Sequence, residues 1–133
     1  MKYLVDTDIC IHWLKGSNSV QRHFEAVGLG DLAISPITVA ELYYGAHSSN
    51  RVEENLEQSK SFVRHIEMLA MSDVVLDTFG RIKSDLRRHG TLIPDFDLLI
   101  ASTALANRLV LVTNNSQHYS RISGLKLENW LEA

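Results

Sequence analysis

Residues 2–8, KYLVDTD, set a short apolar run directly against two acids. The run Tyr3-Leu4-Val5 predicts a short buried strand, and Asp6-Thr7-Asp8 predicts the turn that follows it. A carboxylate beside a buried segment is costly unless it is paired with a cation or binds a metal. Asp6 is therefore the first candidate for a functional acid.

Two more acids interrupt apolar segments in the same way. Glu41 stands inside residues 37–44, ITVAELYY, and Asp97 directly precedes residues 98–101, LLIA. The helical neighbours of Glu41, three and four positions away, are apolar or small apart from one threonine, so a purely structural use for this acid is hard to find. Three such charges in one small chain indicate a shared cation.

The composition is that of an ordinary globular protein. The chain has 133 residues, of which 45% are apolar and 22% charged, and we expect one domain over residues 1–133. No apolar run approaches the ~20 residues of a membrane span, and the start lacks the pattern of a signal peptide. The single Cys10 rules out an internal disulfide, which suits the cytoplasm. The net charge of −3 argues mildly against nonspecific nucleic-acid binding, unless several acids bind metal.

Strand and helix patterns alternate along the chain. Strands are expected at 2–6, 32–34, 74–76 and 109–112, with a last edge strand at 125–127. Helices are expected at 9–14, 19–27, 36–46, 50–69, 78–88 and 96–107. The sharpest boundary is Ser35-Pro36, a serine N-cap followed by proline at the first helical position. This alternation predicts an α/β fold with a central parallel β-sheet flanked by helices.

In such a sheet, sites form beyond the carboxyl ends of the strands. Asp6 follows the first predicted strand, and Thr113-Asn114-Asn115 follows the strand at 109–112. Carboxylate and amide oxygens are ligands for hard cations such as Mg²⁺ or Mn²⁺. Asp6, Glu41 and Asp97 with an asparagine amide would hold one or two such ions, an arrangement that suits phosphodiester hydrolysis.

Each candidate also has a plain structural alternative. Asp6, Asp8 and Asp95 could cap a turn or a helix, and Asp97 could be only an acid of a helical first turn. Further along, Thr113 could be a strand-end residue, while Asn115 and His118 could lie in a surface loop. Only their shared placement makes a site.

The chain contains four distinctive segments: residues 4–8 (LVDTD), 34–46 (ISPITVAELYYGA), 93–101 (IPDFDLLIA) and 111–115 (LVTNN). Together with the ending at 119–130, these segments resemble the PIN-domain ribonucleases, and specifically the VapC toxins of VapBC toxin–antitoxin pairs. The resemblance runs through essentially the whole chain in order, which implies a single PIN-like domain. The segments around Glu41 and Asp97 are highly specific, whereas Asp6-Thr7-Asp8 alone would be weak.

The resemblance also implies roles for individual residues. Asp6, Glu41 and Asp97 correspond to the metal-binding acids, and Asn115 corresponds to a fourth polar ligand, so these four form the expected catalytic set. The expected supporting residues are Thr113, Asp8 and His118. Many members of the family carry an acid at the position of His118, so this chain lacks one carboxylate for a full second metal site.

The function implied by the resemblance is that of a toxin. It would be a Mg²⁺-dependent endoribonuclease, with Mn²⁺ as a substitute, that hydrolyses RNA phosphodiester bonds and inhibits translation. The RNA would be tRNA or rRNA, and some relatives cut initiator tRNA in the anticodon stem-loop. The family further implies a homodimer, a VapB-type antitoxin that blocks the site, contact with operator DNA only through that antitoxin, and no membrane association.

Two other interpretations remain open at this point. A phosphatase of the haloacid dehalogenase type also begins with an apolar strand and Asp6-Thr7-Asp8, and uses the first Asp as nucleophile. That chemistry needs a lysine and an acid pair after a late strand, where this chain has Thr113-Asn114-Asn115. Alternatively, the chain could be a catalytically weak PIN module that acts mainly by binding its antitoxin.

Overall fold

The computed structural model describes residues 1–131 and contains one five-stranded parallel sheet. Its strands are β1 (Tyr3–Val5), β2 (Leu32–Ile34), β3 (Glu67–Met68), β4 (Val110–Val112) and β5 (Leu127–Glu128). Their order across the sheet is β3-β2-β1-β4-β5, so β1 is central and pairs with β2 and β4. The predicted α/β fold with a central parallel sheet is confirmed. Residues 132–133 of the predicted domain lie outside the described residues.

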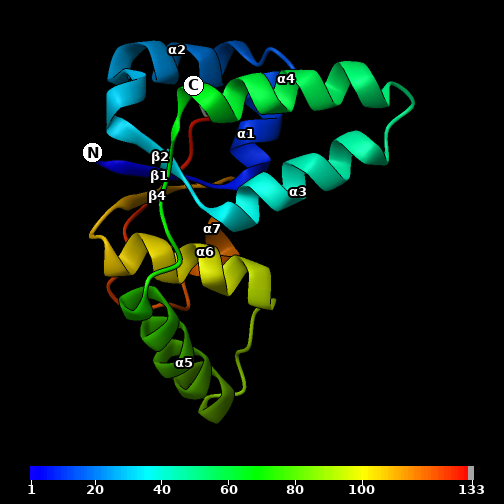
Figure 1. The fold of residues 1–133 in the computed structure, drawn as a ribbon. Helices are drawn as coiled ribbons and strands as arrows, with labels where there is room; N and C mark the ends of the chain where they lie inside the picture. Colours follow the sequence, from blue (N-terminus) through cyan, green and yellow to red (C-terminus); the bar gives the residue numbers. More distant parts are fainter. Residues whose placement is uncertain (132–133) are drawn as a thin grey trace.

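Helices cover both faces of this sheet. They are α1 (Thr7–Leu14), α2 (Asn18–Val27), α3 (Pro36–His47), α4 (Val52–His65), α5 (Asp73–Arg88), α6 (Asp95–Ala106) and α7 (Ser116–Tyr119), with a 3₁₀ turn at Leu29–Asp31. Helices α1 to α4 lie on one side of the strands, and α5, α6 and α7 lie on the other (Figure 1). In the described part of the chain, no helix combines the length and apolar character needed to cross a membrane.

The strands feed two separate apolar cores, because successive strand residues point to opposite faces of a sheet. Tyr3 and Val5 of β1 join the cluster under α1–α4, which also holds Phe24, Phe62 and Trp130. The intervening residue of β1 and the middle residue of β4 join the other cluster, under α5–α7: these are Leu4 and Leu111. This alternation decides which helices face the residues that continue β1 and β4.

One predicted strand is wrong. Residues 74–76 open α5 instead, and only Val75 of the three is buried. The Ser72 hydroxyl accepts a hydrogen bond from the Val75 backbone N at 3.5 Å and caps the helix. The buried positions of α5 recur at helical spacing: Val75, Thr78, Ile82 and Leu86. Val74 and Val75 therefore belong to an amphipathic helix. Val75 is the first residue of the buried face of this helix, and Val74 is exposed.

The third strand of the sheet lies inside the predicted helix 50–69. That helix ends at His65, and Glu67–Met68 forms the edge strand β3 beside β2. Both residues of β3 are exposed, so it carries no apolar alternation that would distinguish it from the end of a polar-faced helix. Helix α5 begins five residues before the predicted helix 78–88, and α7 was not predicted. The remaining predicted elements agree with the structure to within about two residues.

Candidate active site

The carboxyl ends of β1 and β4 meet at the centre of the sheet, as the parallel arrangement requires. The Asp6 backbone N donates to the carbonyl of Val112 at 2.9 Å, which continues the β1–β4 pairing. The Thr113 hydroxyl then donates to Asp6 Oδ2 at 2.8 Å. Each of these two residues follows by two positions a strand residue packed under α5–α7, so they point toward the same side. Asp6 and Thr113 therefore face α6 and α7.

Asp6 is the most deeply placed acid of the site, with 5% of its surface exposed. Its Oδ1 accepts the Thr7 backbone N at 2.8 Å, so it also serves as the N-cap of α1. Burial and the neighbouring charge of Asp8 raise the pKa of Asp6 from 3.8 to about 7, with a smaller contribution from Asp97. The hydrogen bonds from Thr113 and Thr7 oppose that rise. Because its surroundings disfavour the ionised form, the Asp6 carboxylate would be stabilised by a nearby cation.

Asp8 and Asp97 belong to the same electrostatic cluster. Asp8 is only partly exposed, its Oδ1 accepts the Ile9 N at 2.7 Å, and its Oδ2 accepts the Asn114 N at 3.0 Å. Asp97 lies in the first turn of α6, with 26% of its side chain exposed. Burial raises the pKa of Asp8, and the charge of Asp97 raises it further. Asp8 is thus more than a solvent-facing cap, because it ties α1 to the loop after β4.

Glu41, on α3, is linked to this region by a hydrogen bond from Thr7. The Thr7 hydroxyl donates to Glu41 Oε1 at 2.6 Å and lies 3.0 Å from the hydroxyl of the buried Thr38. Since Thr7 has one hydroxyl proton, the second contact takes its proton from Thr38. Glu41 is therefore oriented by the residue that follows Asp6, although none of the sequence patterns above singled out Thr7 as a functional residue.

Asn115 and His118 form the outer edge of the cluster. Asn115 is exposed, and its backbone N donates to the Thr113 hydroxyl at 3.0 Å. Its side-chain Nδ2 lies 2.8 Å from His118 Nδ1, which in turn lies 3.4 Å from Asp97 Oδ2. His118, for which a surface loop was the structural alternative, lies on α7, and 30% of its side chain is exposed. It joins Asn115 to Asp97 at the outer edge of the cluster.

The cluster lacks a strongly basic partner. Within residues 1–131, no lysine or arginine lies at salt-bridge distance from Asp6, Asp8, Glu41 or Asp97. In the same part of the chain, no three acidic, cysteine or histidine side chains are arranged to enclose an ion. The donor set is nevertheless rich in carboxylate oxygen, and a divalent cation would relieve the repulsion that raises the pKa of Asp6. The residues fit a hard cation by their chemistry.

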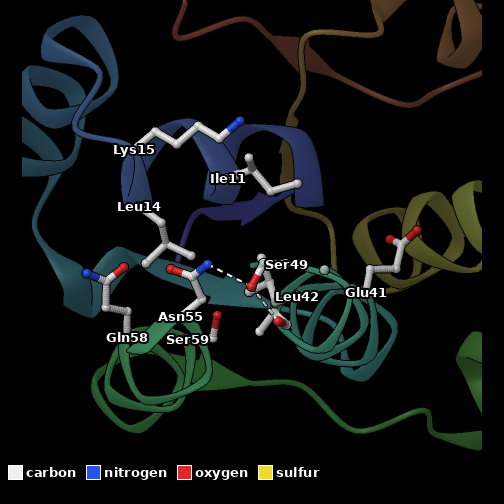
Figure 2. A pocket seen from close by; sticks show the side chains of 11 residues that line it. Ile11, Leu14, Lys15, Glu41, Leu42, Ser49, Asn55, Gln58 and Ser59 are labelled. Atoms are coloured by element: carbon white, nitrogen blue, oxygen red, sulfur yellow. Dashed lines mark hydrogen bonds between the residues drawn. The ribbon is translucent and has the colours of Figure 1, made fainter. Parts of the chain in front are cut away.

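A groove of about 350 Å³ adjoins the site between α1, α3 and α4. Ile11, Leu14 and Leu42 form apolar walls, and the Asn55 side chain donates to the Ser49 hydroxyl at 2.9 Å within it (Figure 2). Glu41 stands apart from the other labelled side chains of the groove (Figure 2). The groove therefore reaches the candidate active site at one point only.

Comparisons with known proteins agree with this geometry. The model of the PIN domain family matches residues 3–125. The "tRNA(fMet)-specific endonuclease VapC" of Shigella flexneri is 35% identical over 98% of each chain, and the "Ribonuclease VapC2" of Rickettsia felis is 36% identical over 98% of each chain. The VapBC crystal structure from Salmonella typhimurium, bound to DNA, matches with a TM-score of 0.92 and 34% identity over 98% of each chain.

The chain belongs to the PIN-domain family. Within that family its place is among the VapC ribonucleases, the toxins of VapBC pairs. The resemblance noted in the sequence is thereby confirmed, and the haloacid dehalogenase alternative is not favoured. Two residues of the site were given no role by that resemblance: Thr7, whose hydroxyl donates to Glu41, and Tyr119, which is fully buried and feels the charges of Asp6 and Asp97.

Proposed function

We propose that this chain is a divalent-metal-dependent endoribonuclease whose metal ligands are Asp6, Glu41 and Asp97. The observation that carries the proposal is the cluster of carboxylates at the ends of β1 and β4, which repel one another and have no lysine or arginine partner in residues 1–131. Mg²⁺ is the ion we favour, with Mn²⁺ as a substitute, because both prefer oxygen ligands.

The ion would supply the Lewis acidity that phosphodiester hydrolysis requires. The protein itself would orient the ligand side chains through hydrogen bonds. Thr113 and the Thr7 backbone fix both oxygens of Asp6, while the Thr7 hydroxyl fixes Glu41. Asn115 serves as a fourth polar ligand at the open side of the site. There His118 can contact an RNA phosphate, since its ring is partly exposed beside Asp97.

The substrate we propose is tRNA, with initiator tRNA cut in its anticodon stem-loop. Support comes from the Shigella flexneri relative, whose name states specificity for tRNA(fMet) and which aligns over 98% of this chain. Single-stranded loops are also the usual targets of sequence-specific RNA recognition, because their bases are free to be read. Cleavage of such a tRNA would inhibit translation in the cytoplasm.

The partner we propose is a VapB-type antitoxin that covers the site. The solved relatives from Salmonella typhimurium and Rickettsia felis are VapBC complexes bound to DNA, with TM-scores of 0.92 and 0.90. We also propose that the toxin is a homodimer and that it meets operator DNA only through the antitoxin.

A cleavage assay on purified protein tests the proposed function. Labelled initiator tRNA is incubated with the protein in Mg²⁺, in Mn²⁺ and in EDTA, beside an elongator tRNA. We expect one discrete cut in the initiator tRNA with either ion and none in EDTA. Cleavage that persists in EDTA, or at the wild-type rate in both Asp6→Ala and Asp97→Ala, would contradict the assignment of the site.

A further inference from the structure

The buried hydroxyl of Tyr119 is energetically unfavourable, and the packing of the fold does not require it. Its side chain is 0% exposed, and its hydroxyl oxygen is the one buried side-chain polar atom in residues 1–131 without a hydrogen-bond partner. Leaving a buried polar group unsatisfied costs about 1–3 kcal/mol. A phenylalanine would fill the same space without that cost, so the hydroxyl calls for a functional explanation.

The position of the hydroxyl suggests what that explanation is. The Tyr119 ring belongs to the apolar cluster that also holds Leu4 and Leu111, each two residues before an acid or hydroxyl of the site. Burial raises the pKa of the Tyr119 hydroxyl most, followed by the charges of Asp6 and Asp97, a side-chain interaction with Asp6 and the charge of Asp8, although no contact has the full geometry of a hydrogen bond. A tyrosine hydroxyl beside carboxylates can act only as a donor to them.

Asp6 has room for a third donor. One of its oxygens accepts the Thr7 backbone N and the other accepts the Thr113 hydroxyl. An ionised carboxylate offers about four acceptor positions, so a further hydrogen bond and an ion can still be accommodated. Because Tyr119 is fully buried, no RNA group reaches it, and any effect on the reaction must pass through a carboxylate.

We infer that Tyr119 is a positioning residue whose hydroxyl donates a hydrogen bond to the Asp6 carboxylate when that carboxylate holds the metal ion. This inference rests on the proposed metal site and adds a residue behind it. In this structure the buried hydroxyl has no partner with hydrogen-bond geometry, and Asp6 is the carboxylate that interacts with it most strongly. Outer partners of metal-ligating carboxylates orient the ligand and strengthen binding.

The test is a Mg²⁺ titration followed by thermal unfolding of the full chain, so that the readout does not depend on cleavage. We compare wild type, Tyr119→Phe and the matched control Tyr3→Phe. Tyr3 is also buried, but it lies in the opposite core, where its ring centroid is 5.1 Å from that of Trp130. In EDTA, Tyr119→Phe should unfold at the same temperature as wild type or higher, since it loses only an unpaired hydroxyl.

In Mg²⁺ we expect the Tyr119→Phe variant to need about 10-fold more ion for half of the rise in Tm. Tyr3→Phe should keep the wild-type midpoint. In an Asp6→Asn background the Tyr119→Phe change should have no further effect on the midpoint, because residues that act together are not additive. That last result separates positioning of Asp6 from a general loosening of the core.

Three outcomes would overturn the inference. The first is a Mg²⁺ midpoint for Tyr119→Phe equal to that of Tyr3→Phe. The second is a loss of stability in EDTA that accounts for the whole effect. The third is the same effect of Tyr119→Phe in the Asp6→Asn background. If wild type itself shows no Mg²⁺-dependent rise in Tm, the proposed metal site has failed, and the role of Tyr119 fails with it.

Discussion

Asp95 and Asp97 occupy the same turn of α6 and yet lie in opposite surroundings. Asp95 is 57% exposed and pairs with Lys83 Nζ at 2.9 Å. Asp97 is about half as exposed, and its charge acts on Asp6 and Asp8. Among the described residues, its one ion-pair contact is with His118. The outer acid belongs to the packing of α6 on α5, whereas the inner acid adds repulsion to a crowded site.

The same contrast separates larger parts of the molecule. On the outer surfaces of α4 and α5, acids meet arginines, as in the pair of Glu57 with Arg64 and that of Asp85 with Arg88. At the carboxyl ends of β1 and β4, the acids contact, within residues 1–131, one another, hydroxyls, backbone N–H groups and a histidine, but no lysine or arginine. Acids without a counter-charge mark the place where an external cation is expected.

The largest expected effect comes from neutralising each of the two acids of α6 in turn, which tests whether Asp95 and Asp97 differ in function. Asp97→Asn should lower the rate of RNA cleavage by at least about 100-fold, because it removes one of the proposed metal ligands. Asp95→Asn, two residues away, should stay within about twofold of wild type. Initial rates at saturating Mg²⁺ measure both. Equal losses in the two variants would mean that the helix N-terminus, and not the site, is what matters.

The pH dependence of stability gives the second effect. The pKa of Asp6 is raised in the fold to about 7 from 3.8, so the folded state binds a proton more tightly than the unfolded state. Metal-free protein should therefore be most stable below about pH 4 as far as this group is concerned, and should lose that stability as the pH rises through 7. In EDTA at pH 8, the free energy of unfolding of Asp6→Asn should exceed that of wild type by roughly 4 kcal/mol, since the pKa of Asp6 rises from 3.8 to about 7.

The gap between Asp6→Asn and wild type should shrink as the pH falls from 7 toward 4 and close below pH 4, where the wild-type carboxyl group becomes protonated in both states. Urea unfolding in EDTA at a series of pH values measures it. A gap that is constant with pH would show that Asp6 is not the group that titrates.

A third effect concerns Thr7, which orients Glu41. Thr7→Val keeps the shape of the side chain but removes the hydroxyl that donates to Glu41 at 2.6 Å. We expect a loss of about 10-fold in cleavage rate, typical of a residue that holds a ligand. Thr7→Ser should recover most of the rate, because it restores the donor. A valine variant as active as wild type would show that Glu41 needs no such support.

The smallest expected effect concerns the exposed ion pair between Lys83 and Asp95. Lys83→Met removes the cation beside Asp95 while it keeps an unbranched apolar stem. Exposed ion pairs contribute about 0–1 kcal/mol, so the free energy of unfolding should fall by less than 1 kcal/mol. Cleavage should be unchanged. A large loss of activity would place Lys83 in the RNA path instead of on the structural surface.

Local chemistry made several features predictable from the sequence. Ser35-Pro36 marks the start of α3 because a hydroxyl cap and a proline without an N–H act within one turn, and Ser35 does accept the Ile37 N at 3.0 Å. The approach of Asp6 to Thr113 followed from a general property of parallel sheets, once two strands had been recognised. Neither inference required knowledge of tertiary contacts.

The features that were missed depend on contacts between distant elements. The pair Val74-Val75 resembles a strand by residue type, but the spacing from Val75 to Leu86 packs it as a helix against α6. Thr7 and Tyr119 are unremarkable in a sequence, because their importance comes from α3 lying beside α1 and from α7 covering the ends of the strands.

The register of the central strand has a consequence for how the molecule is made. Tyr3 of β1 pairs with Val110 of β4, and Asp6 receives its hydroxyl donor from a residue 107 positions later. Contacts so distant along the chain form late, because a long loop must close before they contribute any stability. During synthesis from the amino terminus, β1 and Asp6 emerge first but stay incomplete until β4 has been made. Asp6 is therefore present in the growing chain well before the fold can place it beside Thr113.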